Sequence, residues 1–227
     1  MYPSLIMSSN KIKSLYTSQK KSIATIIRKK KLYTDDVYTF LKLRNDLFSF
    51  RGSERPYRVN TGSIAGVLFE WTLQCLLETL IEQEGMEDKL NLLPNYPTSY
   101  VKKEHGHSKV NIDLAVTIPT NNENEKSIIY IEAKTNFDDG FDRFYEESTT
   151  IRHHRRKNYS GFKYYYIALH GPSVNLKQKY SRQLNNLERR KELILFNWIF
   201  KDEETNIEAL SKLIKFFRDD IRKLKNL

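Results

Sequence analysis

Two carboxylates and one lysine stand out by their chemistry and their place in the sequence. Asp113 lies in a stretch where apolar and polar residues alternate, and Glu132-Ala133-Lys134 ends the apolar run 128–131. Side chains two residues apart on a β-strand point to the same side of it, so Glu132 and Lys134 share a face. Charges at the end of a buried strand are costly unless they pair with a metal or with each other. Asp113, Glu132 and Lys134 are therefore the candidate catalytic residues.

These residue types suit metal-dependent hydrolysis of a phosphodiester. Two carboxylates that converge on one point form a hard-oxygen site for Mg²⁺, and the backbone carbonyl of Ala133 is a candidate further ligand. A bound Mg²⁺ polarises a phosphoryl oxygen and lowers the pKa of its water, while Lys134 would orient or help deprotonate that water and offset charge on the phosphate. The predicted metal ligands are thus Asp113, Glu132 and Ala133.

Other motifs fit a site less well. A second Glu-x-Lys triplet, Glu87-Asp88-Lys89, lies in a polar stretch after an expected helix, where charged residues belong on a solvated surface. His105 and His107 have the spacing of no helix-borne zinc pair, and no cysteine accompanies them. The sequence also contains no Gly-rich phosphate loop, which argues against nucleotide-driven work.

The order of Asp113, eighteen residues and Glu132-Ala133-Lys134 resembles the PD-(D/E)xK nuclease signature, best known from type II restriction endonucleases. The resemblance covers roughly residues 63 to 200, and Ile112 stands where the signature has proline. It implies an α/β fold with a restriction-endonuclease-like core, in which a central mixed β-sheet of about four to five strands is flanked by helices. It also implies Mg²⁺-dependent, sequence-specific hydrolysis of double-stranded DNA that leaves 5′-phosphate ends, carried out by a homodimer.

Members of this family often carry an additional acid on the helix before the hairpin, and Glu70 has the matching place. Glu70 is therefore a fourth candidate catalytic residue. An alternative remains, because Glu70, Gln74, Glu78 and Glu82 fall at steps of four and would also form an ordinary solvated helix face.

Hydrophobic periodicity predicts the elements that must position these residues. Alternation predicts strands over 110–118 and 127–135, most simply an antiparallel hairpin. Further strands are expected over 163–170 and 193–200. Helices are expected over residues 11–31, 34–49, 63–85 with Gly85 as terminator, 138–158 in part, 178–191 and 207–224.

The chain of 227 residues is long enough for one well-filled core and is expected to be a single domain. Its expected parts are an N-terminal helical region (1–62), the nuclease core (63–200) and a C-terminal amphipathic helix (201–227). That last helix or the N-terminal pair of helices could form the dimer contact, although packing on the chain's own core is the more common fate of such a stripe.

Charge favours a polyanionic partner. The sequence has 38 Lys and Arg against 28 Asp and Glu, a formal net charge of +10, and binding of basic residues to phosphates releases condensed counterions. We predict that DNA is contacted by the densest cationic run and by arginines further along the chain, since arginine suits guanine edges. The alternative is that these residues form an ordinary solvated surface. They are His153, His154, Arg155, Arg156, Lys157, Arg182, Arg189 and Arg190.

Several features predict a cytoplasmic protein without a membrane anchor. No apolar run approaches the length of a membrane span, and residues 1–13 lack the order of a signal peptide. The single cysteine, Cys75, lies among leucines, which fits a reducing compartment.

Other functions stay open. Nucleases of the same superfamily that act in repair, on Holliday junctions or at transposon ends share the catalytic residues. A non-catalytic DNA-binding or partner-binding protein with a salt-bridged hairpin would lose stability rather than activity on Asp113→Ala and would ignore Mg²⁺. An RNA nuclease or RNA-binding protein would prefer RNA when duplex DNA and RNA compete for it.

Overall fold

The computed structural model describes residues 9–43, 61–101, 109–119, 126–138, 140–155, 162–198 and 202–225. The chain divides into two compact units, residues 1–84 with 200–227 and residues 85–199, and each is described by itself. The expected single domain stays a prediction.

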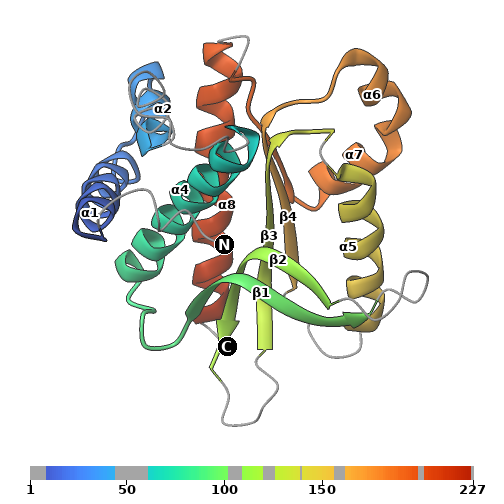
Figure 1. Ribbon diagram of the computed structural model, residues 1–227, viewed down its shortest axis with the longest axis horizontal. Coiled ribbons are helices and arrows are strands. Elements are labelled where there is room, and N and C mark those ends of the chain that lie inside the picture. Colours follow the sequence, from blue (N-terminus) through green and yellow to red (C-terminus); the bar gives the residue numbers. More distant parts are fainter. Residues whose placement is uncertain are drawn as a thin grey trace. The chain divides into compact units, whose positions relative to one another are not determined.

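The first unit is helical in its described part (Figure 1). Its helices are α1 (Ser9–Ile26), α2 (Thr34–Phe40), α4 (Thr61–Gln83) and α8 (Glu203–Lys225). They match the expected helices with two exceptions. α1 ends before the basic run 28–31, and α2 ends at Phe40, while residues 44–49 of the second expected helix lie outside the described part. Gly85 follows α4 with a φ of 65°, a left-handed conformation that terminates a helix, as predicted.

The apolar stripe of α8 is covered within the chain. Leu210, Leu213, Phe217 and Ile221 are buried, and α8 contacts both α2 and α4. The amphipathic helix expected from the sequence is confirmed, and its stripe has the more common fate of packing on the chain's own core.

The second unit holds a five-stranded mixed sheet in the order β1-β2-β3-β4-β5. β1 pairs antiparallel with β2 and β2 antiparallel with β3, whereas β3, β4 and β5 are parallel. The strands are β1 (Asn91–Val101), β2 (Lys109–Ile118), β3 (Lys126–Asn136), β4 (Lys163–His170) and β5 (Leu193–Leu195), and the helices are α5 (Phe141–Arg155), α6 (Val174–Lys179) and α7 (Ser181–Arg189). The predicted α/β class, with a mixed sheet flanked by helices, is confirmed, as is the antiparallel hairpin.

β1 is the strand that the hydrophobic pattern did not predict. It contains Pro94 and Pro97, which normally argue against a strand, and Asn95 has a positive φ of 51°. β1 lies at the edge of the sheet, where a residue without an N–H leaves no partner unsatisfied. The position at the edge therefore explains why prolines are tolerated there.

Two other elements differ from the expected ones. The strand expected over 193–200 is the three-residue β5, after which Asn197 forms an isolated bridge with His170. The helix expected over 178–191 is divided into α6 and α7 at Tyr180, a buried residue whose ring lies 5.1 Å from that of Phe141. Burial of this aromatic ring against α5 accompanies the break.

Aromatic packing holds α5 on the sheet. Phe144 lies with its ring centroid 4.8 Å from that of Tyr164 and 4.7 Å from that of Tyr166. The hydroxyl of Tyr166 donates a hydrogen bond of 2.6 Å to the backbone carbonyl of Phe137. Tyr164, Tyr165 and Tyr166 are all fully buried, so they fill the core.

Phe144→Ala is expected to lower the free energy of unfolding by about 3–5 kcal/mol, because it leaves a cavity between α5 and β4. Val174→Ala, at a position 71% exposed, is the control and should change it by less than about 0.5 kcal/mol. Denaturant unfolding measures both, and equal stabilities would contradict this account of the core.

Candidate active site

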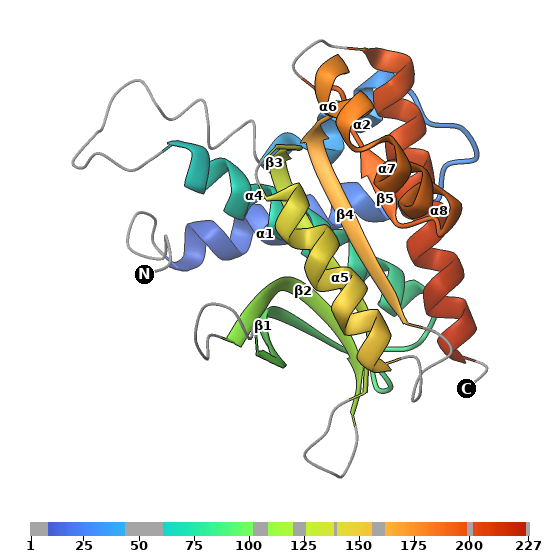
Figure 2. The same ribbon diagram turned by 90° about the vertical axis from the view of Figure 1, so that its right-hand side faces the viewer.

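β2 and β3 part at the residues singled out in the sequence. Their backbone pairing runs from Ile118–Lys126 to Leu114–Ile131. Beyond this stretch β2 stays paired with β1, where Ile112 is in register with Tyr96. β3 stays paired with β4, where Glu132 is in register with Tyr166. Figure 2 shows β2 bending away from β3. We call this place, between Asp113 and Glu132, the fork.

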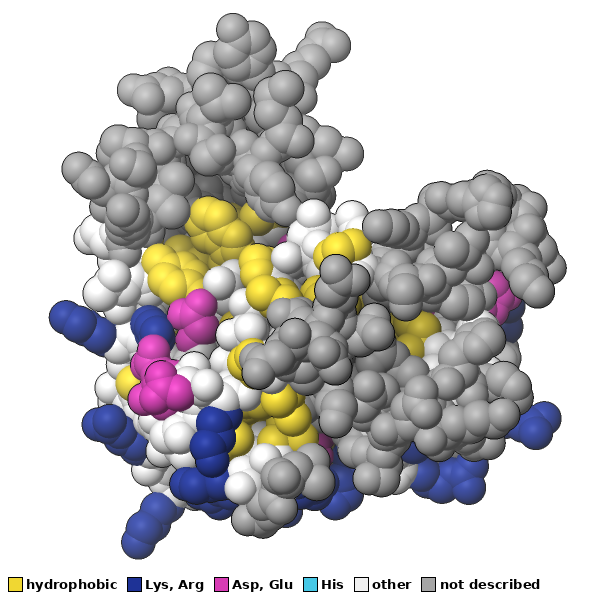
Figure 3. Space-filling model, turned by 90° about the horizontal axis from the view of Figure 1, so that it is seen from below, with side chains coloured by type: hydrophobic (Ala, Val, Ile, Leu, Met, Phe, Trp, Pro, Cys, Tyr) yellow, Lys and Arg dark blue, Asp and Glu magenta, His cyan; other side chains and the backbone are white. Residues whose placement is uncertain are grey.

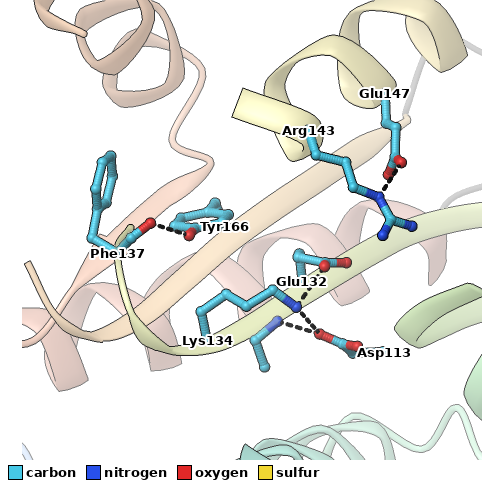
Figure 4. A network of polar contacts seen from close by, with 8 residues as sticks. Asp113, Glu132, Lys134, Phe137, Arg143, Glu147 and Tyr166 are labelled. Carbon is cyan, nitrogen blue, oxygen red and sulfur yellow. Dashed lines mark hydrogen bonds and ion pairs between the residues drawn. The ribbon is translucent and has the colours of Figure 1, made fainter. Parts of the chain in front are cut away.

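The side chain of Asp113 bridges the fork. Its Oδ2 accepts a hydrogen bond of 2.8 Å from the backbone N–H of Ala133 and another of 3.2 Å from Nζ of Lys134 (Figure 4). A carboxylate thus takes the place of a backbone acceptor where the strands separate, and an unpaired buried N–H would be costly. The same contact fixes the direction in which the Asp113 carboxylate points.

Lys134 lies between the two acids. Its Nζ is 2.6 Å from Oε1 of Glu132 and 3.2 Å from Oδ2 of Asp113. The side chains of Asp113, Glu132 and Lys134 are 20%, 16% and 23% exposed, so the cluster is largely covered and still open to solvent. The structure brings the three predicted catalytic residues together, with one cation shared by two carboxylates.

The close approach of these charges changes their protonation. Burial and the nearby Asp113 carboxylate raise the pKa of Glu132 to about 7, against the opposing effect of Lys134. Burial lowers the pKa of Lys134, but the Glu132 and Asp113 carboxylates outweigh it and raise that pKa to about 12. Lys134 is therefore an ammonium at neutral pH, suited to orient groups and offset charge and unable to accept a proton in this arrangement.

Helix α5 contributes a second charged pair beside the cluster. Nε of Arg143 lies 2.7 Å from Oε1 of Glu147, one helical turn on, and the two side chains are 62% and 4% exposed. Beside the larger effects of burial and Asp113, the charge of Glu147 also raises the pKa of Glu132. Beside the larger effect of its hydrogen bond to Glu147, the charge of Glu132 also raises the pKa of Arg143, so both pairs lie within electrostatic reach of each other. Sequence reasoning missed this pair, since an i,i+4 ion pair is an ordinary feature of an exposed helix.

Tyr164 is a further residue that the sequence did not single out for the site. Its hydroxyl is buried and, among the described residues, has no hydrogen-bond partner. Burial and the charges of Glu132, Glu147 and Asp113 hold its pKa well above the ordinary value. A neutral phenol donor therefore lies within electrostatic range of the acids.

The donors at the fork are of the kind that Mg²⁺ uses. In the part of the chain that is described, no group of three or more His, Cys, Asp or Glu is arranged to hold a metal. Mg²⁺ commonly takes one or two carboxylates and keeps several waters, so Asp113 and Glu132 suffice in number and type. The N–H of Ala133 is bonded to Asp113, and its carbonyl stays a predicted ligand.

The other predicted site residues lie on other elements or outside the described residues. Glu70 lies on α4, in the first unit, and is partly buried, so its role stays a prediction. Lys89 and its triplet, Glu87-Asp88-Lys89, are exposed, as expected of a solvated stretch. His105 and His107 lie outside the described residues.

The predicted DNA contacts are only partly described. Arg182 and Arg189 are exposed on α7, where they line a surface hollow with Asn185 and Asn186, and Arg190 follows half-buried. His153, His154 and Arg155 belong to α5 with side chains outside the described part, and Arg156 and Lys157 lie outside it altogether. On the face drawn in Figure 3, the described Lys and Arg side chains lie along the edge rather than in one patch.

Comparisons of the chain with protein-family models, curated proteins and solved structures found no match. Within the described residues, no helix has the length and apolar character needed to cross a membrane.

The raised pKa of Glu132 predicts how stability depends on pH. The folded state holds this proton up to about pH 7, against 4.5 for the ordinary group, so it binds more protons than the unfolded state in between. The contribution of Glu132 to the free energy of unfolding is then fully present below about pH 4.5. It is lost as pH rises through about 7, which lowers the free energy of unfolding by about 1–3 kcal/mol in EDTA. Glu132→Gln should flatten this part of the pH profile of unfolding.

Glu87→Gln, at the exposed triplet, serves as the control and should keep the wild-type profile. Denaturant unfolding of the three proteins from about pH 5 to about pH 8 makes the comparison. Parallel profiles for wild type and Glu132→Gln would contradict the assignment of a raised pKa to Glu132.

Proposed function

We propose that the protein is a Mg²⁺-dependent, type II restriction endonuclease that hydrolyses double-stranded DNA at a specific sequence and leaves 5′-phosphate ends. One observation carries the proposal: Asp113 and Glu132 converge on a single cation, the ammonium of Lys134, where the two strands part. Two carboxylates that converge on one cation support a metal-assisted hydrolytic site, because the same oxygens could hold a divalent ion.

Each residue has a defined part in this proposal. Asp113 and Glu132, with the carbonyl of Ala133, would hold Mg²⁺, which supplies Lewis-acid polarisation of the phosphate and a water of lowered pKa. Lys134 is charged at neutral pH, so it orients the attacking water and offsets charge on the phosphate. The hydrogen bond from Ala133 to Asp113 keeps the first carboxylate in place throughout. Glu70 is kept as a fourth candidate acid.

DNA is the proposed substrate because of charge. The net charge of +10 favours a polyanion, and Arg182 and Arg189 are exposed on α7. We further propose a homodimer, because a two-fold axis matches a palindromic site. A cytoplasmic location is part of the proposal, since the one cysteine, Cys75, is buried as a free thiol.

A structural role for the same residues is the main rival. Asp113 satisfies a backbone N–H at the fork, so Asp113→Ala should lower stability whether or not the protein is an enzyme. Lys134 makes no such backbone contact among the described residues, and its removal therefore separates catalysis from folding better.

The direct test is digestion of a well-mapped plasmid or phage DNA in Mg²⁺ and in EDTA. We expect discrete fragments in Mg²⁺ alone, and a loss of at least about 10²-fold in rate for Lys134→Ala. Lys89→Ala removes the lysine of the exposed Glu-x-Lys triplet and should cut like wild type.

The pattern of products distinguishes the alternatives. Discrete fragments identify a sequence-specific endonuclease, whereas a smear points to a nonspecific or structure-directed nuclease of the same superfamily. DNA left intact under every condition by a protein that still binds it would overturn the proposal in favour of a non-catalytic binding protein. Preference for RNA in a competition with duplex DNA would point to an RNA-directed protein instead.

A further inference from the structure

Helix α5 covers the sheet face on which Glu132 and Lys134 lie. Glu132 is in register with Tyr166 of β4, and neighbours in register point their side chains to the same side of a sheet. Tyr166 packs against Phe141 and Phe144 of α5, with ring centroids 5.3 Å and 4.7 Å away. The turn of α5 that carries Arg143 therefore lies next to the acid cluster at the fork.

The ion pair between Arg143 and Glu147 is asymmetric. Glu147 is nearly inaccessible, with 4% of its side chain exposed, while Arg143 is 62% exposed. The contact runs through Nε of the guanidinium, at 2.7 Å, and it is the one contact of this group with the described residues. A buried carboxylate thus fixes the stem of the guanidinium and leaves its two terminal nitrogens available to a ligand.

Those nitrogens lie on the side of the fork. Figure 4 shows the guanidinium extending from α5 over the strand that bears Glu132 and Lys134, with Glu147 on the side away from Glu132. The hydrogen bond and the charge of Glu147 raise the pKa of Arg143, and the charge of Glu132 adds to this effect, in agreement with this placement. Lys134 and Arg143 are therefore two cations on opposite sides of Glu132.

A phosphate that approaches this place meets three acids, Asp113, Glu132 and Glu147, against two cations. Like charges repel, so a phosphodiester next to the two acids of the fork needs a positive group of its own. A guanidinium held by one nitrogen presents its other two nitrogens in one plane, where they can bind two phosphate oxygens. The ammonium of Lys134 is a single point charge shared by both carboxylates, which leaves Arg143 for the two-nitrogen contact.

We propose that Arg143 binds the phosphate to be cleaved and that Glu147 is the residue that positions it. The inference rests on the proposed function for the identity of the phosphate, as a DNA phosphodiester, and deepens it. Arg143 touches the substrate in this account, whereas Glu147 acts only through Arg143.

The test compares Arg143→Ala with Arg222→Ala in the full-length chain. Arg222 is a matched control, because its Nε lies 2.8 Å from Oε2 of Glu84 and its side chain is 58% exposed. Binding of a short fluorescein-labelled DNA duplex is measured by anisotropy in Ca²⁺ at several salt concentrations, and plasmid cleavage is measured in Mg²⁺. Arg143→Lys shows whether a positive charge alone suffices, and thermal unfolding shows whether each variant folds.

We expect Arg143→Ala to weaken duplex binding about tenfold and to reduce the slope of log affinity against log salt by about 0.9, one phosphate contact. Cleavage should fall by about 10²-fold, with Arg143→Lys in between. Arg222→Ala should match wild type in affinity and slope. Glu147→Gln should weaken binding in the wild-type background and add nothing in the Arg143→Ala background, since a positioning residue has no effect without its partner.

The two proposals fail in different ways. A wild type that cleaves DNA, with an Arg143→Ala variant equal to it in rate, affinity and salt slope, overturns the inference and leaves the nuclease standing. A wild type that never cleaves, with an Arg143→Ala variant that loses the salt-dependent contact, supports phosphate binding and overturns the nuclease. Equal losses for Arg143→Ala and Arg222→Ala would show a general effect of charge and overturn the inference.

Discussion

The hydrogen bond from the N–H of Ala133 to the carboxylate of Asp113 is the contact on which the site depends. β2 and β3 pair as an antiparallel ladder, with a register shift between Val116 and Thr117, up to Leu114 and Ile131, and then each follows its other neighbour in the sheet. Parting strands leave backbone groups unpaired, at a cost that a side chain can offset when it supplies the missing acceptor. Asp113 does so, and its carboxylate is thereby aimed into the opening. One contact thus satisfies the backbone and orients the Asp113 carboxylate.

The cluster at the fork has more carboxylates than cations, because Asp113 and Glu132 share Lys134. Two carboxylates share one ammonium in a setting largely shielded from water. Burial and the neighbouring Asp113 carboxylate raise the pKa of Glu132 to about 7, and the two carboxylates keep Lys134 protonated. Such clusters are poor contributors to stability, because the cost of burying the charges offsets much of their attraction. A divalent cation would relieve this imbalance in the proposed function. Aromatic contacts of α5 with Tyr164 and Tyr166 hold this helix beside the fork, and the buried Glu147 fixes the position of Arg143 on it.

Period-two alternation in the sequence was enough to predict β2 and β3 and to place Asp113, Glu132 and Lys134 near one another, because side-chain direction in a strand follows directly from spacing. β1 was missed because Pro94 and Pro97 contradict strand propensity, which only an edge position can override. The fork was not predictable either, since hydrophobic period says nothing of where backbone pairing ends. Arg143 and Glu147 look like a common helical ion pair until the burial of one partner and the packing of Phe144 on Tyr166 are known. These missed features depend on strand register and burial, which are set by contacts between distant parts of the sequence and not by the local residue pattern.

Crystals of the protein with a short DNA duplex and Mn²⁺ would test the central claim most directly, because the anomalous signal of Mn²⁺ locates the ion independently of any assumption about the site. The account predicts an anomalous peak at the fork, in contact with carboxylate oxygens of Asp113 and Glu132, with Nζ of Lys134 displaced from its bridging position and a DNA phosphate beside the ion. A fork without Mn²⁺, with Lys134 still between the two acids while DNA is bound, would contradict it and leave the cluster as a structural ion pair.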